Sequence, residues 1–214
     1  MRSVGPMVGR LCVICMSLCL MGYAAEAESS KGILDRALPG LCCALTQPKH
    51  SSLQGELLEM QAEDQRVRQI AISERNWNML QEIDQKHAPR LKEIIAEFGW
   101  PGIILVGLEG AEAMWLLVQH QDLDFQKQCL PLLKDAVDKQ EAPFRNYAYL
   151  LDRVCMYGNE PQVYGTQWVE AAGELVMYPV CDPELLAQRR VEAGLIPIEE
   201  YEKQLLNLFM ERER

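Results

Sequence analysis

His120 and Asp124 form the sharpest pair of chemically active side chains in the sequence. If one helix continues through both residues, their spacing puts the imidazole and the carboxylate on one face, close enough for a hydrogen bond or for shared metal ligation. Three interpretations are open. The pair is a general acid/base pair in which Asp124 orients His120, or part of a metal site, or a helix-terminal histidine beside an aspartate that caps the next helix.

A metal site at this position would need further ligands from elsewhere in the chain. Asp64, Asp84 and Asp152 are the available carboxylates. Their spacing specifies no metal site, because it matches none of the ligand patterns that metal centres use. The sequence therefore predicts no metal ligands and leaves the cofactor, if there is one, unknown.

A second group of polar residues lies further along the chain, and we predict that it binds a ligand: Asp152, Arg153, Gln162, Tyr164 and Gln167. On a strand, Gln162 and Tyr164 share one face while Gln167 takes the other, so polar groups occur on both faces. Either this is an edge strand in water, or its hydrogen-bonding groups are arranged toward a cleft.

No common catalytic motif specifies a reaction, since the sequence has no GxSxG, HExxH or phosphate-binding glycine loop. Two classes of function stay open. The first class is a hydrolase or group-transfer enzyme. In it His120 would act as general base, and Arg153, Tyr164 and Gln167 would bind a polar substrate. In a binding or structural module, the same groups would form a buried polar network that fixes a hairpin on the helices. We favour the module, because no motif specifies chemistry.

Apolar residues at helical spacing must position these groups. From Ser52 onward the apolar residues recur at helical spacing, and Asp64 lies on the apolar face that they form. A helix over residues 110–118 would have almost no polar face, which predicts a central helix surrounded by other helices. Pro89 predicts a boundary between two helices, and Asp182 before Pro183 predicts an N-cap.

The hydrophobic period changes from about 3.6 to 2 after residue 160. Residues 162–169 and 175–180 read as two strands around Gly173, and helices follow at 183–194 and 198–210. The predicted fold class is α+β, a mostly helical single domain with a small antiparallel β-hairpin near residues 162–180.

Several short strings together resemble an uncharacterised bacterial domain family of unknown function, over roughly residues 55 to 205. They are Trp100-Pro101-Gly102, the Gln119-His120 to Asp124 segment, Asp152-Arg153-Val154, Pro161-Gln162-x-Tyr164-Gly165-Thr166-Gln167, Asp182-Pro183, and Arg189-Arg190 followed by Tyr201. The resemblance implies one small domain, sometimes exported, with His120, Asp124, Asp152, Arg153, Gln162, Tyr164 and Gln167 as its polar residues. It implies no activity.

The N-terminal residues indicate export. Arg2 and Arg10 precede an apolar, uncharged run that is too short to span a bilayer, and Ala25-Glu26-Ala27 is a small-x-small cleavage pattern. We predict a signal peptide over 1–27, an irregular lead-in over 28–51 and a single mainly helical domain over 52–214, in a periplasmic or secreted protein with no stable membrane span after cleavage.

The net charge of -10 argues against nucleic acid as a partner, because binding phosphates requires a basic patch. The partner, an unknown ligand or protein, is not specified. Cys42, Cys43, Cys129, Cys155 and Cys181 remain after cleavage. Cys129 is expected to be a buried thiol on a helix, and a bridge between Cys155 and Cys181 is an open alternative to free thiols.

Overall fold

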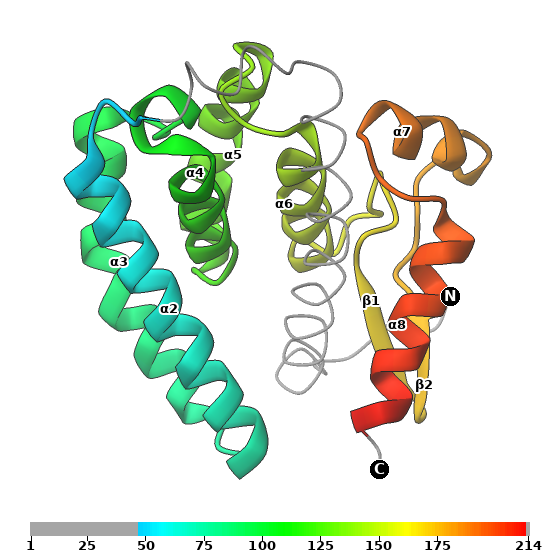
Figure 1. The fold of residues 1–214 in the computed structure, drawn as a ribbon. Coiled ribbons are helices and arrows are strands. Elements are labelled where there is room, and N and C mark those ends of the chain that lie inside the picture. Colours follow the sequence, from blue (N-terminus) through cyan, green and yellow to red (C-terminus); the bar gives the residue numbers. More distant parts are fainter. Residues whose placement is uncertain (1–46, 213–214) are drawn as a thin grey trace. The chain divides into compact units, whose positions relative to one another are not determined.

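The computed structural model describes residues 47–212, which form two compact units, residues 47–150 and 151–212 (Figure 1). The first holds α2 (Ser51–Glu74), α3 (Asn78–Phe98), α4 (Ile103–Gln119) and α5 (Leu123–Asp138), and α6 (Phe144–Tyr157) begins in it. The second adds β1 (Trp168–Ala171), β2 (Glu174–Met177), the 3-10 helix η1 (Pro183–Leu185), α7 (Leu186–Glu192) and α8 (Ile198–Arg212). The predicted class, mostly helical α+β with one antiparallel hairpin, is confirmed.

The predicted signal peptide and most of the lead-in lie outside the described residues. Within residues 47–212, no helix is both long enough and apolar enough to cross a bilayer. Export of the protein therefore stays a prediction from the N-terminal sequence.

Helices α2, α3 and α4 contact one another and form the centre of the first unit, with α5 against α4 (Figure 1). Leu53, Leu57 and Ala71 of α2 are buried at the spacing of one helical face. Two charged residues, Asp64 and Arg68, occupy positions on that same buried face. The helical period therefore places a carboxylate and a guanidinium in the interior of the bundle.

Helix α4 is the predicted central helix, and most of its residues from Val106 to Gln119 are buried. It bends at Gly107, whose φ of 72° is a conformation that other residues rarely adopt. An added Cβ there would lie 2.9 Å from the side chain of Gln54 on α2. Glycine thus allows both the bend and the close approach of α2.

Two helix boundaries differ from those that the sequence predicts. Pro89 does not divide the chain into two helices, because α3 runs through it without a break. Proline cannot donate the backbone hydrogen bond at that position, and its ring crowds the preceding turn, so the continuous helix carries a local cost. The sequence pattern of residues 144–151 predicts a short helix that ends near Asp152, but α6 continues to Tyr157. Asp152 and Arg153 therefore project from a helix rather than from its end.

The hairpin of the second unit is shorter than predicted. Trp168 pairs with Met177 and Ala171 with Glu174, and the turn lies between them. The segment before β1 is a loop, joined to the chain after β2 by a single bridge between Gln162 and Val180. Residues 162–167 are called the 162–167 loop below.

Helices α7 and α8 follow the hairpin. Asp182 occupies the predicted N-cap position, but its backbone is left-handed with a φ of 43° and its side chain makes no capping hydrogen bond. Pro183 begins a 3-10 turn instead. Gly194, with a φ of 68°, ends the turn after α7 as predicted. The buried face of α8 carries Tyr201, Leu205 and Phe209.

Candidate functional site

Asp64 and Arg68 lie one helical turn apart on the buried face of α2. Asp64 is 1% exposed and Arg68 is 4% exposed. The Nε of Arg68 donates to Oδ1 and Oδ2 of Asp64 at 2.9 and 3.0 Å, and its Nη2 lies 2.8 Å from Oδ1. The two opposite charges therefore compensate each other, which offsets much of the cost of removing either one from water.

Arg68 also connects α2 to α3. Its Nη2 donates to Oδ1 of Asp84, whose side chain is 22% exposed. One guanidinium thus bridges carboxylates from two neighbouring helices, a geometry that suits its fixed fork of donors. The bridge extends from the buried interior to the partly exposed edge of the bundle.

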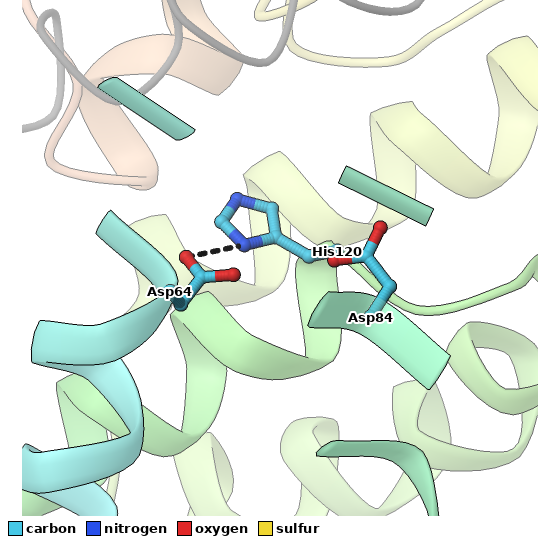
Figure 2. Close-up of side chains that lie close together, drawn as sticks. All are labelled: Asp64, Asp84 and His120. Carbon is cyan, nitrogen blue, oxygen red and sulfur yellow. Dashed lines mark ion pairs between the residues drawn. The ribbon is translucent and has the colours of Figure 1, made fainter. Parts of the chain in front are cut away.

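His120 adds an imidazole from the end of α4. It is the C-cap residue of that helix, and its side chain is 2% exposed. Figure 2 shows its Nδ1 facing the Asp64 carboxylate, with 3.0 Å between Nδ1 and Oδ2. We call Asp64, Arg68, Asp84 and His120 the His120 cluster. Three helices each contribute to it.

Two neighbouring side chains, His120 and Arg68, decide the charge of Asp64. Burial by itself raises the pKa of this carboxyl, because burial disfavours the charged form. His120 and then Arg68, through their charge and their hydrogen bonding, outweigh burial and hold the pKa well below its usual value. Asp64 is therefore ionised at neutral pH, and a proton on Nδ1 of His120 makes the contact between the two residues favourable.

Asp64, Asp84 and His120 also bring together atoms of the kind that bind metals, all within 4.8 Å of one another (Figure 2). Arg68 already donates to both carboxylates. The positive charge of Arg68 repels a divalent cation, and its N–H groups already occupy lone pairs of both carboxylates, so it disfavours a metal ion at this position. The arrangement fits an internal ion-pair network better than a metal centre.

Asp124 does not share a helix with His120, because α4 ends before His120 and α5 begins after Asp122. Asp124 is exposed in the first turn of α5. Asp122 caps that helix, accepting a backbone hydrogen bond of 2.8 Å through Oδ1. Asp64 takes the place beside the imidazole that the sequence assigned to Asp124.

Arg68 is a member of the cluster that sequence reasoning missed. Asp64 stood out as a carboxylate on an apolar face, but its partner four residues later did not. Opposite charges at this spacing on a buried stripe are a usable signal, since buried charges are nearly always paired. That signal predicts the pair, while contact with His120 depends on how three helices pack.

In the second unit, Asp152 organises the 162–167 loop from α6. Its side chain is completely buried. Oδ1 accepts from the backbone N–H groups of Val163 and Tyr164 at 2.7 and 3.0 Å. Oδ2 accepts from the backbone N–H and the hydroxyl of Thr166, both at 2.9 Å. Burial raises the pKa of Asp152, and these hydrogen bonds oppose the rise.

Gln162 holds the same loop from its beginning. Its Nε2 donates to the carbonyl oxygens of Gln167 and Tyr178 at 2.9 and 2.8 Å, and its Oε1 accepts from the N–H of Gln167 at 2.8 Å. The Gln167 side chain donates to Oγ1 of Thr166 at 3.0 Å. Both glutamines are completely buried, so these amide groups are engaged within the unit.

Two residues that the sequence did not assign to the site support the loop from α7 and α8. The Nη1 of Arg190 donates to the carbonyl of Tyr164 at 2.8 Å, and its Nε donates to that of Ile196 at 2.7 Å. The guanidinium lies 5.0 Å from the centre of the Tyr201 ring. The Tyr201 hydroxyl donates to the carbonyl of Thr166 at 3.1 Å. Both residues belong to the strings that carry the family resemblance.

The five predicted binding residues thus differ in how accessible they are. Asp152, Gln162 and Gln167 are buried within the loop network, and Arg153 is 2% exposed on α6. Tyr164 is half-buried. Of the five, Tyr164 has the side chain that is most open to a ligand.

The chain belongs to a family of unknown function, DUF6624, whose model matches residues 51–210. The match includes the His120 cluster and the 162–167 loop. No curated protein and no solved structure matches the chain significantly. The resemblance to an uncharacterised domain family is thereby confirmed at the level of the family, which has no assigned activity.

Proposed function

We propose that the domain is a binding or structural module whose recognition element is the 162–167 loop. The observation that carries this proposal is the carboxylate of Asp152, which accepts hydrogen bonds from three backbone N–H groups and one hydroxyl of the loop. Such a loop is held in one conformation before a ligand arrives, which lowers the entropy that binding would lose.

The exposure of the loop residues supports this reading. The polar side chains that fix the loop are buried, whereas Val163 and Tyr164 at its tip are half-exposed. Tyrosine combines a rigid apolar ring with a hydroxyl, which suits it for direct contact with a partner. We propose Tyr164 as the contact residue, and Asp152, Gln162 and Gln167 as the residues that position it.

The test is the free energy of unfolding of His120→Ala and Gln167→Ala, measured by urea denaturation. If both side chains serve as internal supports, each substitution lowers the free energy of unfolding by about 2 kcal/mol or more. Near-normal stability of both variants would contradict the supporting role proposed for these side chains and point to side chains that contact a ligand or substrate directly. Gln188→Ala, in an exposed pair with Glu192, is the matched control with little expected loss.

A second candidate function is a hydrolase or group-transfer enzyme with His120 as general base. The observation that favours it is the 3.0 Å contact between Nδ1 of His120 and Oδ2 of Asp64. In general-base histidines a carboxylate at one ring nitrogen fixes the ring, so that the other nitrogen can accept a proton. In this candidate Asp64, in place of Asp124, orients the base.

A panel of ester, phosphoester, glycoside and peptide substrates tests the enzymatic candidate. An activity that depends on His120 falls by about 10²-fold to 10⁴-fold in His120→Gln. Asp124→Asn, at an exposed carboxylate on α5, is the control and should leave the activity unchanged. Circular dichroism confirms that the variants remain folded. No turnover on any substrate class, or turnover unchanged in His120→Gln, contradicts this candidate.

We also propose that the module acts outside the cytoplasm, as a periplasmic or secreted protein. The support is the sequence pattern of residues 1–27, with its basic start, apolar run and Ala-x-Ala end. Expression of the full chain, fractionation and N-terminal sequencing test it. A new N-terminus at Glu28 is the expected result, and full-length protein in the cytoplasm contradicts it.

A further inference from the structure

Cys155 and Cys181 lie in the same unit and flank one short piece of chain. The N–H of Glu160 donates to the carbonyl of Cys155 at 2.8 Å. The N–H of Cys181 donates to the carbonyl of Gln162 at 2.9 Å. Residues 160–162 are therefore hydrogen-bonded to the backbone of both cysteines, which brings the end of α6 and the chain after β2 together.

The sulfur of Cys181 is held in place by Arg189. The Nη1 of Arg189 donates to the carbonyl of Cys181 at 2.7 Å and lies 3.4 Å from its Sγ. The Nη2 of the same guanidinium donates to Asp182 at 3.2 Å. Both cysteines are half-buried, so a small oxidant in solvent has access to them.

Cys181 also acts on the Cys155 thiol electrostatically. Burial, followed by the charges of Asp152, Glu160 and Cys181, raises the pKa of Cys155 to about 11. Cys129 differs, because it is completely buried on α5 in the other unit, and burial raises its pKa to about 12. Cys42 and Cys43 lie outside the described residues.

We propose that Cys155 and Cys181 are a disulfide-forming pair that closes when the protein meets a small-molecule disulfide such as oxidised glutathione. The Cys181 thiolate attacks one sulfur of the oxidant and releases one glutathione thiolate, which leaves a mixed disulfide. The Cys155 thiolate then attacks Sγ of Cys181 and releases the second glutathione. Two protein thiols are oxidised, and one oxidised glutathione is reduced to two thiols.

Closure of this bond would connect α6 to the segment after β2 and enclose the 162–167 loop and the hairpin. A disulfide between Cys155 and Cys181 closes the chain between them into a ring, which restricts the unfolded chain more than the folded one. We expect the oxidised protein to melt roughly 5–10 °C above the reduced protein. The bond would therefore lock the loop that Asp152 organises.

Peptide mapping of the mature chain after reduction, refolding and treatment with oxidised glutathione tests the pair. The expected result is a peptide linking Cys155 to Cys181 and an intact mass that is lower by two hydrogen atoms. In Cys155→Ser the second step is blocked, so we expect a stable glutathione adduct on Cys181. In Cys181→Ser we expect no linked peptide.

Three results would overturn the proposal. One is a native protein in which both thiols keep separate glutathione adducts or remain open to alkylation after oxidation. Another is a linked peptide that joins Cys42 or Cys43 to either residue in place of the Cys155–Cys181 pair. The third is an oxidised protein with the predicted link that melts at or below the temperature of the reduced protein.

Discussion

Nδ1 of His120 lies 3.0 Å from Oδ2 of Asp64, and Arg68 binds the same carboxylate from one turn further along α2. The contact ties the end of α4 to the middle of α2, and Arg68 extends it to Asp84 on α3. A single buried carboxylate thereby connects three helices. The contribution of this carboxylate to the free energy of unfolding can be measured.

Asp64→Asn is expected to destabilise the protein by about 3–5 kcal/mol, because it leaves the Arg68 guanidinium buried beside a neutral amide. Urea denaturation followed by circular dichroism gives the free energy of unfolding. The matched control is Asp138→Asn, whose carboxylate is 59% exposed in a surface pair with Lys134 and is expected to contribute less than about 1 kcal/mol. Equal effects of the two substitutions would be inconsistent with a buried network.

The same carboxylate predicts a dependence of stability on pH. The pKa of Asp64 is lower in the folded protein than in the unfolded chain, where it is about 3.9. Its contribution is therefore fully present above that value and is lost as the pH falls toward the folded-state pKa. The difference in stability between the wild type and Asp64→Asn should shrink below about pH 4, by up to about 1.4 kcal/mol per pH unit. A difference that stays constant through this range would argue against the lowered pKa.

Arg68→Leu tests the bridge between α2 and α3. The substitution keeps an apolar side chain on the buried face but leaves the carboxylate of Asp64 without its guanidinium, so a loss of about 3–5 kcal/mol is expected. Arg90→Leu is the control, since Arg90 is 38% exposed and pairs with Glu56 at the surface, where an ion pair contributes about 1 kcal/mol or less. A smaller loss for Arg68→Leu than for Arg90→Leu would refute the bridge.

The sequence predicts much of the fold because local patterns decide it. The helical period places Asp64 on the buried face of α2, and the apolar run of residues 110–118 predicts the central helix. Pro89 misleads, since a proline removes one hydrogen bond, and the packing of α3 on both sides of it outweighs that loss. Asp182 lies at the predicted N-cap position, but its backbone is left-handed instead of extended and its side chain makes no capping hydrogen bond.

The candidate sites are harder to predict, because they depend on contacts between distant segments. Gln162, Tyr164 and Gln167 alternate as they would on a strand, yet their segment is a loop whose N–H groups are bound by Asp152 on α6. The choice of Asp124 as partner of His120 follows from spacing along one helix, whereas the real neighbour, Asp64, is supplied by another helix. Spacing shows which groups share an element and gives no information on which elements meet.

Asp152→Asn is expected to loosen the 162–167 loop. An amide can accept fewer hydrogen bonds than a carboxylate and brings two N–H groups toward existing donors, so a loss of about 2 kcal/mol or more is expected. Hydrogen exchange provides the specific readout, with faster exchange at the amides of Val163, Tyr164 and Thr166. Asp124→Asn, at an exposed carboxylate, should leave exchange at these amides unchanged. Unaltered protection in Asp152→Asn would show that the carboxylate does not hold the loop.

Addition of metal ions tests whether the His120 cluster is a metal site. With Arg68 bound to both carboxylates, Zn²⁺ or Mn²⁺ at a few equivalents should not raise the melting temperature, because a metal that binds only the folded state would stabilise it. Isothermal titration calorimetry checks the same point. Stoichiometric binding that disappears in Asp84→Asn would show that the cluster is a metal site after all.

A double-mutant cycle on Asp64 and His120 tests the central claim, that this buried contact supports the fold. The free energy of unfolding is measured for the wild type, Asp64→Asn, His120→Ala and the double variant. We predict a coupling energy of about 1–3 kcal/mol, as expected for residues in direct contact within one network. Additive effects, with a coupling energy below about 0.5 kcal/mol, would contradict the claim that the contact stabilises the fold.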